Sequence, residues 1–346
     1  MNSFVASYLI QEGITNGAIY CLLAVAILLV FSVTRIIFIP QGEFVSYAAL
    51  TYAALREGKL PGTVGFTLAL VSVMVGARLL RGIAEGNLRH SLLEALKSAL
   101  LPLLVAVVVF ASAPYVLPAA VDALLAIALV TANGPLIYAI VYQPLAKSST
   151  LVLLIVSMAL HLVLVEFGLF FFGPGGARTE PLLDLSFSIG SLPVPAQSLA
   201  IYLAAAVLIL GLFLFSERTL YGKALRAAAI NPLGARLMGV SSTMAGSVAF
   251  AASAFIGAVC GVLVSSVTTI YYDTGFVLGL KGFVAAVIGG FVSYPLAALG
   301  ALAVGLMESF SAFYASQYKE TIVFTLIIPV LLWRSMRRRG TPEEDH

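Results

Sequence analysis

The most constraining feature of this sequence is a series of apolar stretches, several of them near or beyond the ~18 residues that a helix needs to span a bilayer. They lie at 14–33, 43–56, 62–80, 99–113, 121–142, 150–172, 197–215, 243–265, 281–313 and 320–334. Because lipid offers no hydrogen-bonding partner to an open strand edge, these segments must be helical. The alternating ~10-residue segments of a membrane barrel are absent. The sequence predicts an all-α polytopic membrane protein.

Composition supports this fold class and excludes others. Of the 346 residues, 61% are hydrophobic and 10% are charged, whereas a soluble domain carries roughly a quarter charged residues. The formal net charge of +3 gives no reason to expect a nucleic-acid partner. Cys21 and Cys260 both lie inside apolar segments. We expect them to be small buried side chains and not a disulfide framework.

The sequence offers no catalytic machinery. It contains no Gly-rich phosphate-binding loop with a lysine, no HExxH motif and no clustered cysteine and histidine, and its three histidines are His90, His161 and His346. A membrane-embedded enzyme would need a paired His/Asp/Glu cluster, which we do not find. We therefore expect no catalytic residue, no metal site and no cofactor in this chain, so any ATP and Mg²⁺ would be used by partner subunits.

Lysine and arginine in short loops predict the orientation, because cytoplasmic loops carry an excess of both. The predicted cytoplasmic groups are Arg35; Arg78, Arg81, Arg89 and Lys97; Lys147; Arg218, Lys223, Arg226 and Arg236; and Arg334, Arg337, Arg338 and Arg339. The loop 173–196 sets Asp184 and Glu180 against Arg178 and is expected outside. The N-terminus is then outside and the tail 335–346 cytoplasmic. Met1–Glu12 lacks a basic region, so the first apolar run is expected to be a retained span.

The predicted alternation of spans is consistent as far as residue 265 and fails beyond it if 281–313 is a single span. The sequence Gly289–Pro295 can interrupt that stretch. We therefore expect 281–291 and 296–313 to form a re-entrant or discontinuous pair. In the less apolar stretch 82–98, leucines recur at helical spacing, which predicts a helix in the cytoplasmic interface or, alternatively, a helix that contacts a partner.

Residues 220–240 predict a pair of short helices on the cytoplasmic side. Residues 224–230 are strong helix formers. Asn231 followed by Pro232 fits an N-cap with proline at the first helical position, and Gly239 fits a helix stop. A soluble motor needs such a stiff element to push against, because a flexible loop would lose the movement in its own entropy. An ordinary pair of interface helices is the alternative.

The sequence resembles permeases of the branched-chain amino acid (Liv-type) ABC importer family at blocks spread along nearly the whole chain. The matching residues are Gly17–Ala24, Gln41–Phe44, Tyr142–Leu145, Phe172–Pro174, Arg226, Ala227, Ala229, Asn231, Ala235, Gly239, Gly275–Phe276 and Gly279–Gly290, followed by Ser293, Pro295, Gly300, Gly305 and Glu308. The chain departs from the family pattern at 38–41 and around Leu164–Glu166. Compared with the family, residues 57–113 look like an additional helical pair.

This resemblance implies the permease fold of an ABC importer over one transmembrane domain, 1–346, in the bacterial inner membrane. It implies cytoplasmic coupling helices at 221–239, with Lys223, Arg226, Asn231, Pro232, Arg236 and Gly239 as the residues that couple to the ATPase. The implied partners are ABC ATPase subunits, a second permease subunit, sister or identical, and an extracytoplasmic substrate-binding protein. An amino acid is the expected substrate, with urea, amides or small carboxylates as alternatives. A self-sufficient secondary transporter or channel is the rival class.

Polar residues inside the predicted spans are candidates for the translocation path, since a charge at mid-membrane costs about 2.5–3.5 kcal/mol or more. They are Glu43, His161, Glu166, Tyr271, Asp273, Lys281 and Glu308. Glu43 either caps its own helix or lines the path. His161 and Glu166 are expected to bond neighbouring helices in preference to substrate.

Lys281 is expected to open a half-helix and either to extend outward or to pair with Asp273. Irregular backbone at membrane depth is tolerated only beside protein or a water cavity. This makes 271–295 the best candidate region around the path. The pairs Gly13/Gly17, Gly257/Gly261 and Gly300/Gly305 permit close helix approach, within the chain or against a second subunit.

Overall fold

The computed structural model describes residues 3–115, 117–146, 148–181, 185–189, 192–291 and 293–338. Lys147, Asp184, Arg339 and the tail residues 340–346, including His346, lie outside the described residues. Eight helices in the described part are long and apolar enough to cross a membrane. They are α1 (Ser3–Thr34), α3 (Gly62–Ala84), α4 (Leu88–Ser112), α5 (Ala119–Ile137), α6 (Thr150–Phe172), α7 (Ala196–Arg218), α10 (Ser242–Val264) and α12 (Tyr294–Tyr314).

Shorter elements connect and complete these spans. They are the 3-10 turn η1 (Ile39–Gly42), α2 (Glu43–Arg56), the π-helical turn η2 (Tyr138–Tyr142), the strands β1 (Ser186–Ile189) and β2 (Leu192–Pro195), α8 (Leu220–Ile230), α9 (Pro232–Leu237), α11 (Thr274–Ile288), η3 (Ser316–Tyr318), α13 (Lys319–Thr325) and α14 (Ile327–Arg338). The strands form an antiparallel hairpin that pairs Phe187 with Val194.

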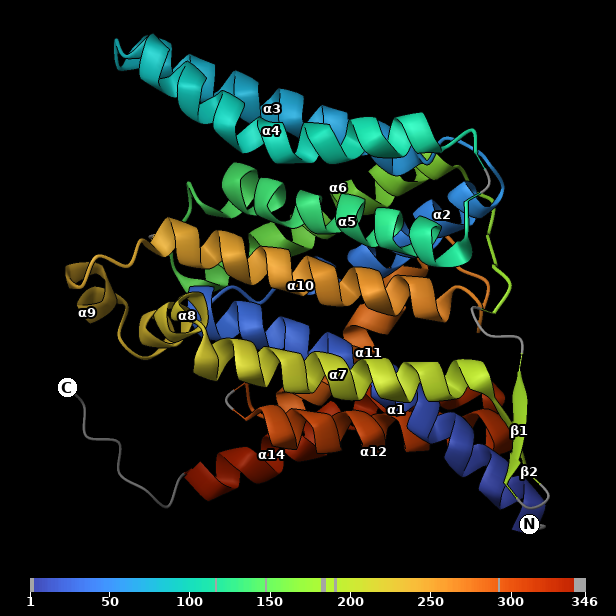
Figure 1. Cartoon of the computed structure of the whole chain (residues 1–346). Helices are drawn as coiled ribbons and strands as arrows, with labels where there is room; N and C mark the ends of the chain where they lie inside the picture. The colour runs from blue at the N-terminus through green and yellow to red at the C-terminus, as the bar shows by residue number, and fades with distance from the viewer. Residues whose placement is uncertain are drawn as a thin grey trace.

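The long helices lie side by side, and the connections gather at two opposite ends (Figure 1). The start of α1 and the β1–β2 hairpin lie at one end, which we call the hairpin end. The helices α8 and α9, and the last turn of α14, lie at the other, the α8–α9 end. Arg35 is also at the α8–α9 end, because its Nη2 donates to the carbonyl of Ala229 at 3.4 Å. Arg35 and the basic residues of α8 and α9 therefore lie at the opposite end of the bundle from the start of the chain.

Local capping explains where several helices begin. The side chain of Ser149 accepts a hydrogen bond from the Val152 amide at the start of α6, Ser241 does so from Met244 at α10, and Ser293 from Leu296 at α12. A side-chain oxygen at this position satisfies one of the amides that a helix N-terminus leaves unpaired. These serines fix the starts of three spans that composition alone leaves uncertain by a few residues.

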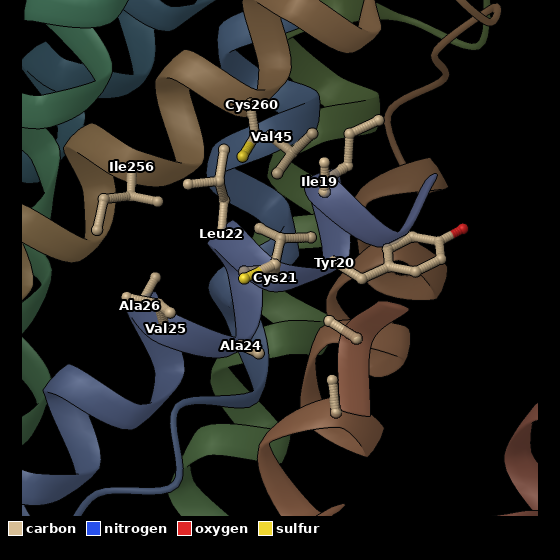
Figure 2. Packing of buried hydrophobic residues seen from close by; sticks show 14 of the residues in the cluster. Ile19, Tyr20, Cys21, Leu22, Ala24, Val25, Ala26, Val45, Ile256 and Cys260 are labelled. Carbon is tan, nitrogen blue, oxygen red and sulfur yellow. The ribbon is translucent and has the colours of Figure 1, made fainter. Parts of the chain in front are cut away.

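The largest core cluster surrounds the middle of α1. Figure 2 shows Cys21 and Leu22 of α1 facing Val45 of α2 and Cys260 of α10. Both cysteines are buried and their thiols are free, as the apolar segments around them predict. The helix α1 therefore lies at the centre of the bundle, where every face of its middle turns is covered by protein.

The glycine pairs support packing within this chain. A methyl group added at Gly305 of α12 would lie 2.4 Å from the amide nitrogen of Gly17 in α1, and one at Gly261 of α10 would lie 2.3 Å from the carbonyl of Val45 in α2. These backbones come so close that only glycine fits between them. Of the two alternatives, contact within the chain is thus confirmed for these positions.

The prediction of a separate interface helix at 82–98 is wrong. Residues 82–84 end α3, and from Leu88 the chain forms one continuous helix to Ser112. The leucine spacing of 82–98 continues into the apolar run at 99–113, and Pro102 lies within α4 without ending it. Arg78 also joins α3 to α4 by donating to the Glu94 carbonyl at 2.6 Å and to the Ser98 hydroxyl at 2.7 Å.

The remaining segments agree with prediction in part. The half-helix expected to open at Lys281 begins at Thr274, so Lys281 lies in the middle of α11. The predicted break in 281–313 is confirmed at Gly290 and Phe291, which have φ of 69° and 57°. The last apolar stretch is divided into α13 and α14, and the loop 173–196 contains a β-hairpin that the sequence analysis did not foresee.

Candidate functional site

The first candidate site is the α8–α9 element, which joins the ends of α7 and α10. The Thr219 hydroxyl accepts a hydrogen bond from the Gly222 amide at 2.9 Å, and the Asn231 side chain accepts one from the Gly234 amide at 2.9 Å. These caps start α8 and α9 in turn. Gly239, with φ of 86°, follows the end of α9. Two short helices with a bend at Asn231 are therefore present, as the sequence predicts.

The element is anchored on one face and exposed on the other. Leu225, Ala228 and Ala235 are buried against the ends of the neighbouring spans, including Val33 of α1 and Phe215 of α7. The opposite face exposes large apolar side chains. They are Leu220, Tyr221, Ile230, Leu233, Leu237 and Met238, with exposed fractions from 58% to 85%. Exposed apolar side chains gathered outside the spans mark an interaction surface.

The basic residues of this element have different surroundings. Arg226 forms an ion pair with Glu217 at 2.6 Å, and the two side chains are 45% and 41% exposed. The hydrogen bond that the Arg226 guanidinium donates to this carboxylate raises the pKa of Arg226 above its usual value. Lys223 and Arg236 are exposed. Of the predicted coupling residues, Asn231 and Gly239 shape the backbone, whereas Lys223 and Arg236 face solvent.

A cleft of about 640 Å³ opens beside α9. Gln143 and Pro144, which follow η2, form one wall, and Arg236, Val240 and the first residues of α10 form the other. Tyr142–Leu145 was singled out only through its family resemblance, and sequence reasoning gave no spatial role to it. The structure places this motif next to α9, so the turn between α5 and α6 and the α8–α9 element share one exposed surface.

The second candidate site is the crossing of η1 and α2 with α11. Gly42 and Gly275 are in backbone contact, since a methyl group added at Gly42 would lie 1.8 Å from the Gly275 carbonyl oxygen. The amide of Gly275 donates to the Ser46 hydroxyl at 2.6 Å. Two helices thus begin at the same place, α2 at Glu43 and α11 at Thr274. Such half-helix starts expose amide groups and favour polar or anionic neighbours.

Buried polar side chains surround this crossing. The Gln41 amide donates to the Ser253 carbonyl of α10 at 3.0 Å and accepts from the Ser253 hydroxyl. Glu43 Oε1 lies 2.6 Å from His161 Nδ1 of α6. The His161 ring also stacks on Phe276 of α11, with ring centroids 3.9 Å apart. Side chains from α6 and α10 therefore hold the crossing from two sides.

Glu43 was expected to cap its own helix or to line the path. The structure places it in the first turn of α2, as predicted, but its carboxylate bonds His161 and makes no capping bond. The side chain is 2% exposed, and its second oxygen, Oε2, has no hydrogen-bond partner among the described residues. A space of about 10 Å³, lined by Glu43, Tyr47 and Asn133 among others, adjoins it and is close to the volume that one water needs.

Lys281 neither extends outward nor pairs with Asp273, so both expectations were wrong. Its Nζ donates to Glu308 Oε1 of α12 at 2.5 Å and to Glu320 Oε1 of α13 at 3.1 Å. Tyr20 of α1 donates to the other oxygen of Glu308. Asp273 and Lys281 are eight residues apart, which is about 12 Å along a helix axis, so within one helix they do not meet.

The remaining predicted path residues do not join these buried groups. Tyr271 and Asp273 are exposed where the chain enters α11. Glu166 is exposed on α6, on a different face from the buried His161. The structure therefore brings Glu43, Lys281 and Glu308 into two buried clusters and leaves three residues outside them. Sequence reasoning missed Tyr20, Ser253 and Glu320 as partners. A carboxylate at the start of the last apolar stretch was the one signal that pointed to Glu320.

Within the described residues, no group of three or more histidine, cysteine, aspartate or glutamate side chains is placed to hold a metal ion. The buried clusters are therefore ion pairs and hydrogen bonds between side chains. Their arrangement holds helices together and places charge inside the bundle.

Comparison with known proteins gives matches over most of the chain. The family described as Branched-chain amino acid transport system / permease component matches residues 9–331. The chain is 30% identical over 294 residues to the high-affinity branched-chain amino acid transport system permease protein BraD of Pseudomonas aeruginosa, covering 82% of this chain and 94% of that protein. It is 29% identical over 227 residues to the corresponding LivH of Escherichia coli, covering 64% and 74%.

Proposed function

Because this chain belongs to the family of branched-chain amino acid transport system permease components, we propose that it is the membrane-spanning permease subunit of an ATP-driven amino-acid importer in the bacterial inner membrane. The α8–α9 end faces the cytoplasm and the hairpin end faces outward. The basic residues at the α8–α9 end support this orientation. We propose no catalytic reaction for this chain itself.

The observation that carries this proposal is the two-sided construction of α8–α9. One face is packed on the ends of α1, α7 and α10, and the other exposes Leu233, Leu237 and Met238 outside the spans. An exposed apolar surface of this kind marks a site of contact with another protein or with the membrane surface. ABC ATPase subunits fit this role, because they would supply the energy for which this chain has no machinery. They bind the ATP and Mg²⁺.

A chain of contacts could transmit a movement of the ATPase subunits from α9 to the crossing of η1 and α2 with α11. The element is continuous with α10, and the Ser253 hydroxyl and carbonyl of α10 bond Gln41 of η1. Gln41 lies two residues before Glu43, whose carboxylate bonds α6. A push on the element therefore tilts α10 and changes the contact between η1, α2 and α11. We place the translocation path beside this crossing, where Tyr271 and Asp273 are exposed.

The proposed solute is a branched-chain amino acid, delivered at the hairpin end by an extracytoplasmic binding protein. The named relatives support this class. Urea, amides and small carboxylates are the solutes against which it is tested, because the chain departs from the family pattern at 38–41 and around Glu166. A second permease chain completes the assembly within the bilayer.

The test is uptake by proteoliposomes that contain the complete transporter, purified through a tag on this chain. We expect uptake of radiolabelled leucine. This uptake should require ATP on the side of the membrane that the α8–α9 end faces and the binding protein on the opposite side. Urea, acetamide and acetate are measured in parallel. Uptake by this chain alone, without ATP, would show a self-sufficient transporter or channel and would overturn the proposal.

A variant pair tests the surface itself. Leu237→Glu places a charge in the exposed apolar face of α9, where Leu237 is 81% exposed, so we expect loss of ATPase subunits from the purified complex without loss of folding. Leu88→Glu is the matched control, since Leu88 is also an exposed leucine, 47% accessible, at the turn between α3 and α4. Equal ATPase recovery in both variants would remove α8–α9 from its proposed role.

A further inference from the structure

The outer face of α6 carries a carboxylate where a membrane span should meet lipid. Glu166 is exposed and forms no hydrogen bond or ion pair with any described residue. Six residues separate it from the end of α6 at Phe172, or about 9 Å along the helix. The 23 residues of α6 extend for about 34 Å, so a hydrocarbon core of ~30 Å centred on this helix contains Glu166. Ionisable side chains at that depth normally face protein or water.

The neighbours of Glu166 make this a continuous exposed stripe. Its apolar members are Leu151, Ile155, Leu162, Val163, Phe167 and Phe170, which are 40% to 79% exposed. From Leu151 to Phe170 the stripe extends for about 29 Å along the helix, close to the ~30 Å thickness of the hydrocarbon core. A protein that covers the whole stripe must itself span the membrane.

The exposed face of α7 provides the contrast. It exposes Leu203, Leu210 and Phe213, and the sequence from Ala196 to Ser216 contains no charged residue. Lipid covers such a face without penalty. The two helices have the same length, 23 residues, and are similarly apolar, so the carboxylate is what distinguishes their outer faces.

We propose that the α6 stripe is the contact surface for a second permease chain of this fold, with Glu166 inside that contact. This inference rests on the proposed function, in which permease chains are the membrane-spanning members of the assembly. Soluble ATPases and a soluble binding protein reach the ends of the bundle and not its hydrocarbon depth. A second permease chain supplies both the length to cover the stripe and polar groups for the carboxylate.

The test uses the intact transporter, purified from membranes through a tag on this chain. A photo-crosslinking amino acid replaces Val163 beside Glu166 or, as the control, Leu210 on α7. We expect a protein adduct at position 163, identified by its peptides as a permease of this family, either identical to this chain or different from it. We expect no protein adduct at position 210. Adducts with lipid alone at 163, or with an ATPase or a binding protein, would overturn the proposal.

Two substitutions give an independent measurement. Glu166→Leu removes the polar group and is expected to cause loss of the second permease chain from the purified complex, whereas Glu166→Gln retains hydrogen bonding and retains that chain. If Glu166 faced lipid, the leucine variant would keep its partner and would resist heat better in bilayers. If the purified complex contained the second permease but no ATPase subunits, the proposed function would be contradicted, whereas the proposed α6 interface would still be supported.

Discussion

The α8–α9 element and the interior around α11 are both polar interruptions of an apolar bundle, yet they are built in opposite ways. The caps of α8 and α9 join residues three positions apart, and the charged pair of Arg226 and Glu217 is about half exposed. In the interior, Lys281 reaches residues 27 and 39 positions away and is 4% exposed. The α8–α9 element, the proposed partner surface, is shaped by contacts between residues close in sequence, whereas the interior depends on contacts between distant segments.

The largest expected effect is at Lys281. Lys281→Met leaves the buried Glu308 without its ammonium partner, and breaking a buried pair in this way costs about 3–5 kcal/mol. We expect the free energy of unfolding to fall by that amount, measured by denaturant titration in mixed micelles. The double variant with Glu308→Gln should recover much of the loss. A change below about 1 kcal/mol would show that the cluster behaves like an exposed pair.

Gly42→Ala should have the next largest effect, because the added methyl group has no room against the Gly275 carbonyl. Overpacking of this kind costs about 1–3 kcal/mol. Gly211→Ala in α7 is the control, since nothing lies within 4 Å of an added methyl there. A helical glycine replaced by alanine gains about 0.5–1 kcal/mol. Thermal unfolding of the two variants should shift in opposite directions, and equal shifts would argue against the crossing.

Asn231→Ala tests whether the local caps hold the α8–α9 element. Loss of an N-cap costs about 1 kcal/mol, so we expect faster hydrogen exchange at the amides of α9 and little change in the spans. Asn231→Ser keeps a capping oxygen and should exchange as the original chain does. Unchanged protection of α9 in the alanine variant would mean that packing of Ala235, and not the cap, holds it.

The smallest effect is expected at Arg226. Arg226→Met removes an ion pair that is about half exposed, and exposed pairs contribute little to stability because water and salt screen them. A double-mutant cycle with Glu217→Gln should give a coupling energy far below that of Lys281 with Glu308, and it should decrease further in high salt. A coupling energy as large as that of Lys281 with Glu308 would remove the distinction between the two regions.

Much of the helical framework is predictable, because apolar runs and helix breakers act locally. The spans at 43–56 and 150–172 end where the structure ends them, and the break near Gly290 follows from its glycines. The continuation of 82–98 into α4 was missed because length alone did not show that one helix could serve both stretches. The early start of α11 was missed because Gly275 and the residues before it resemble a loop.

Of the two candidate sites, the α8–α9 element was predictable from the sequence, because its contacts join residues close in sequence. Asn231 and Gly239 shape the α8–α9 element as their residue types indicate, since capping depends on neighbours a few positions away. The partner of Lys281 was not predictable, because the rotation of α11 is set by packing against α1 and α12. The bond from Glu43 to His161 joins residues 118 positions apart, and no periodicity in the sequence links them.

The meeting of Gly42 with Gly275 has an electrical consequence. An added methyl group has no room between the two backbones, so a hydrated cation has none either. In the transporter that we propose, with its path beside this crossing, the contact between the two glycines would therefore close this point to sodium ions and to a continuous file of water molecules.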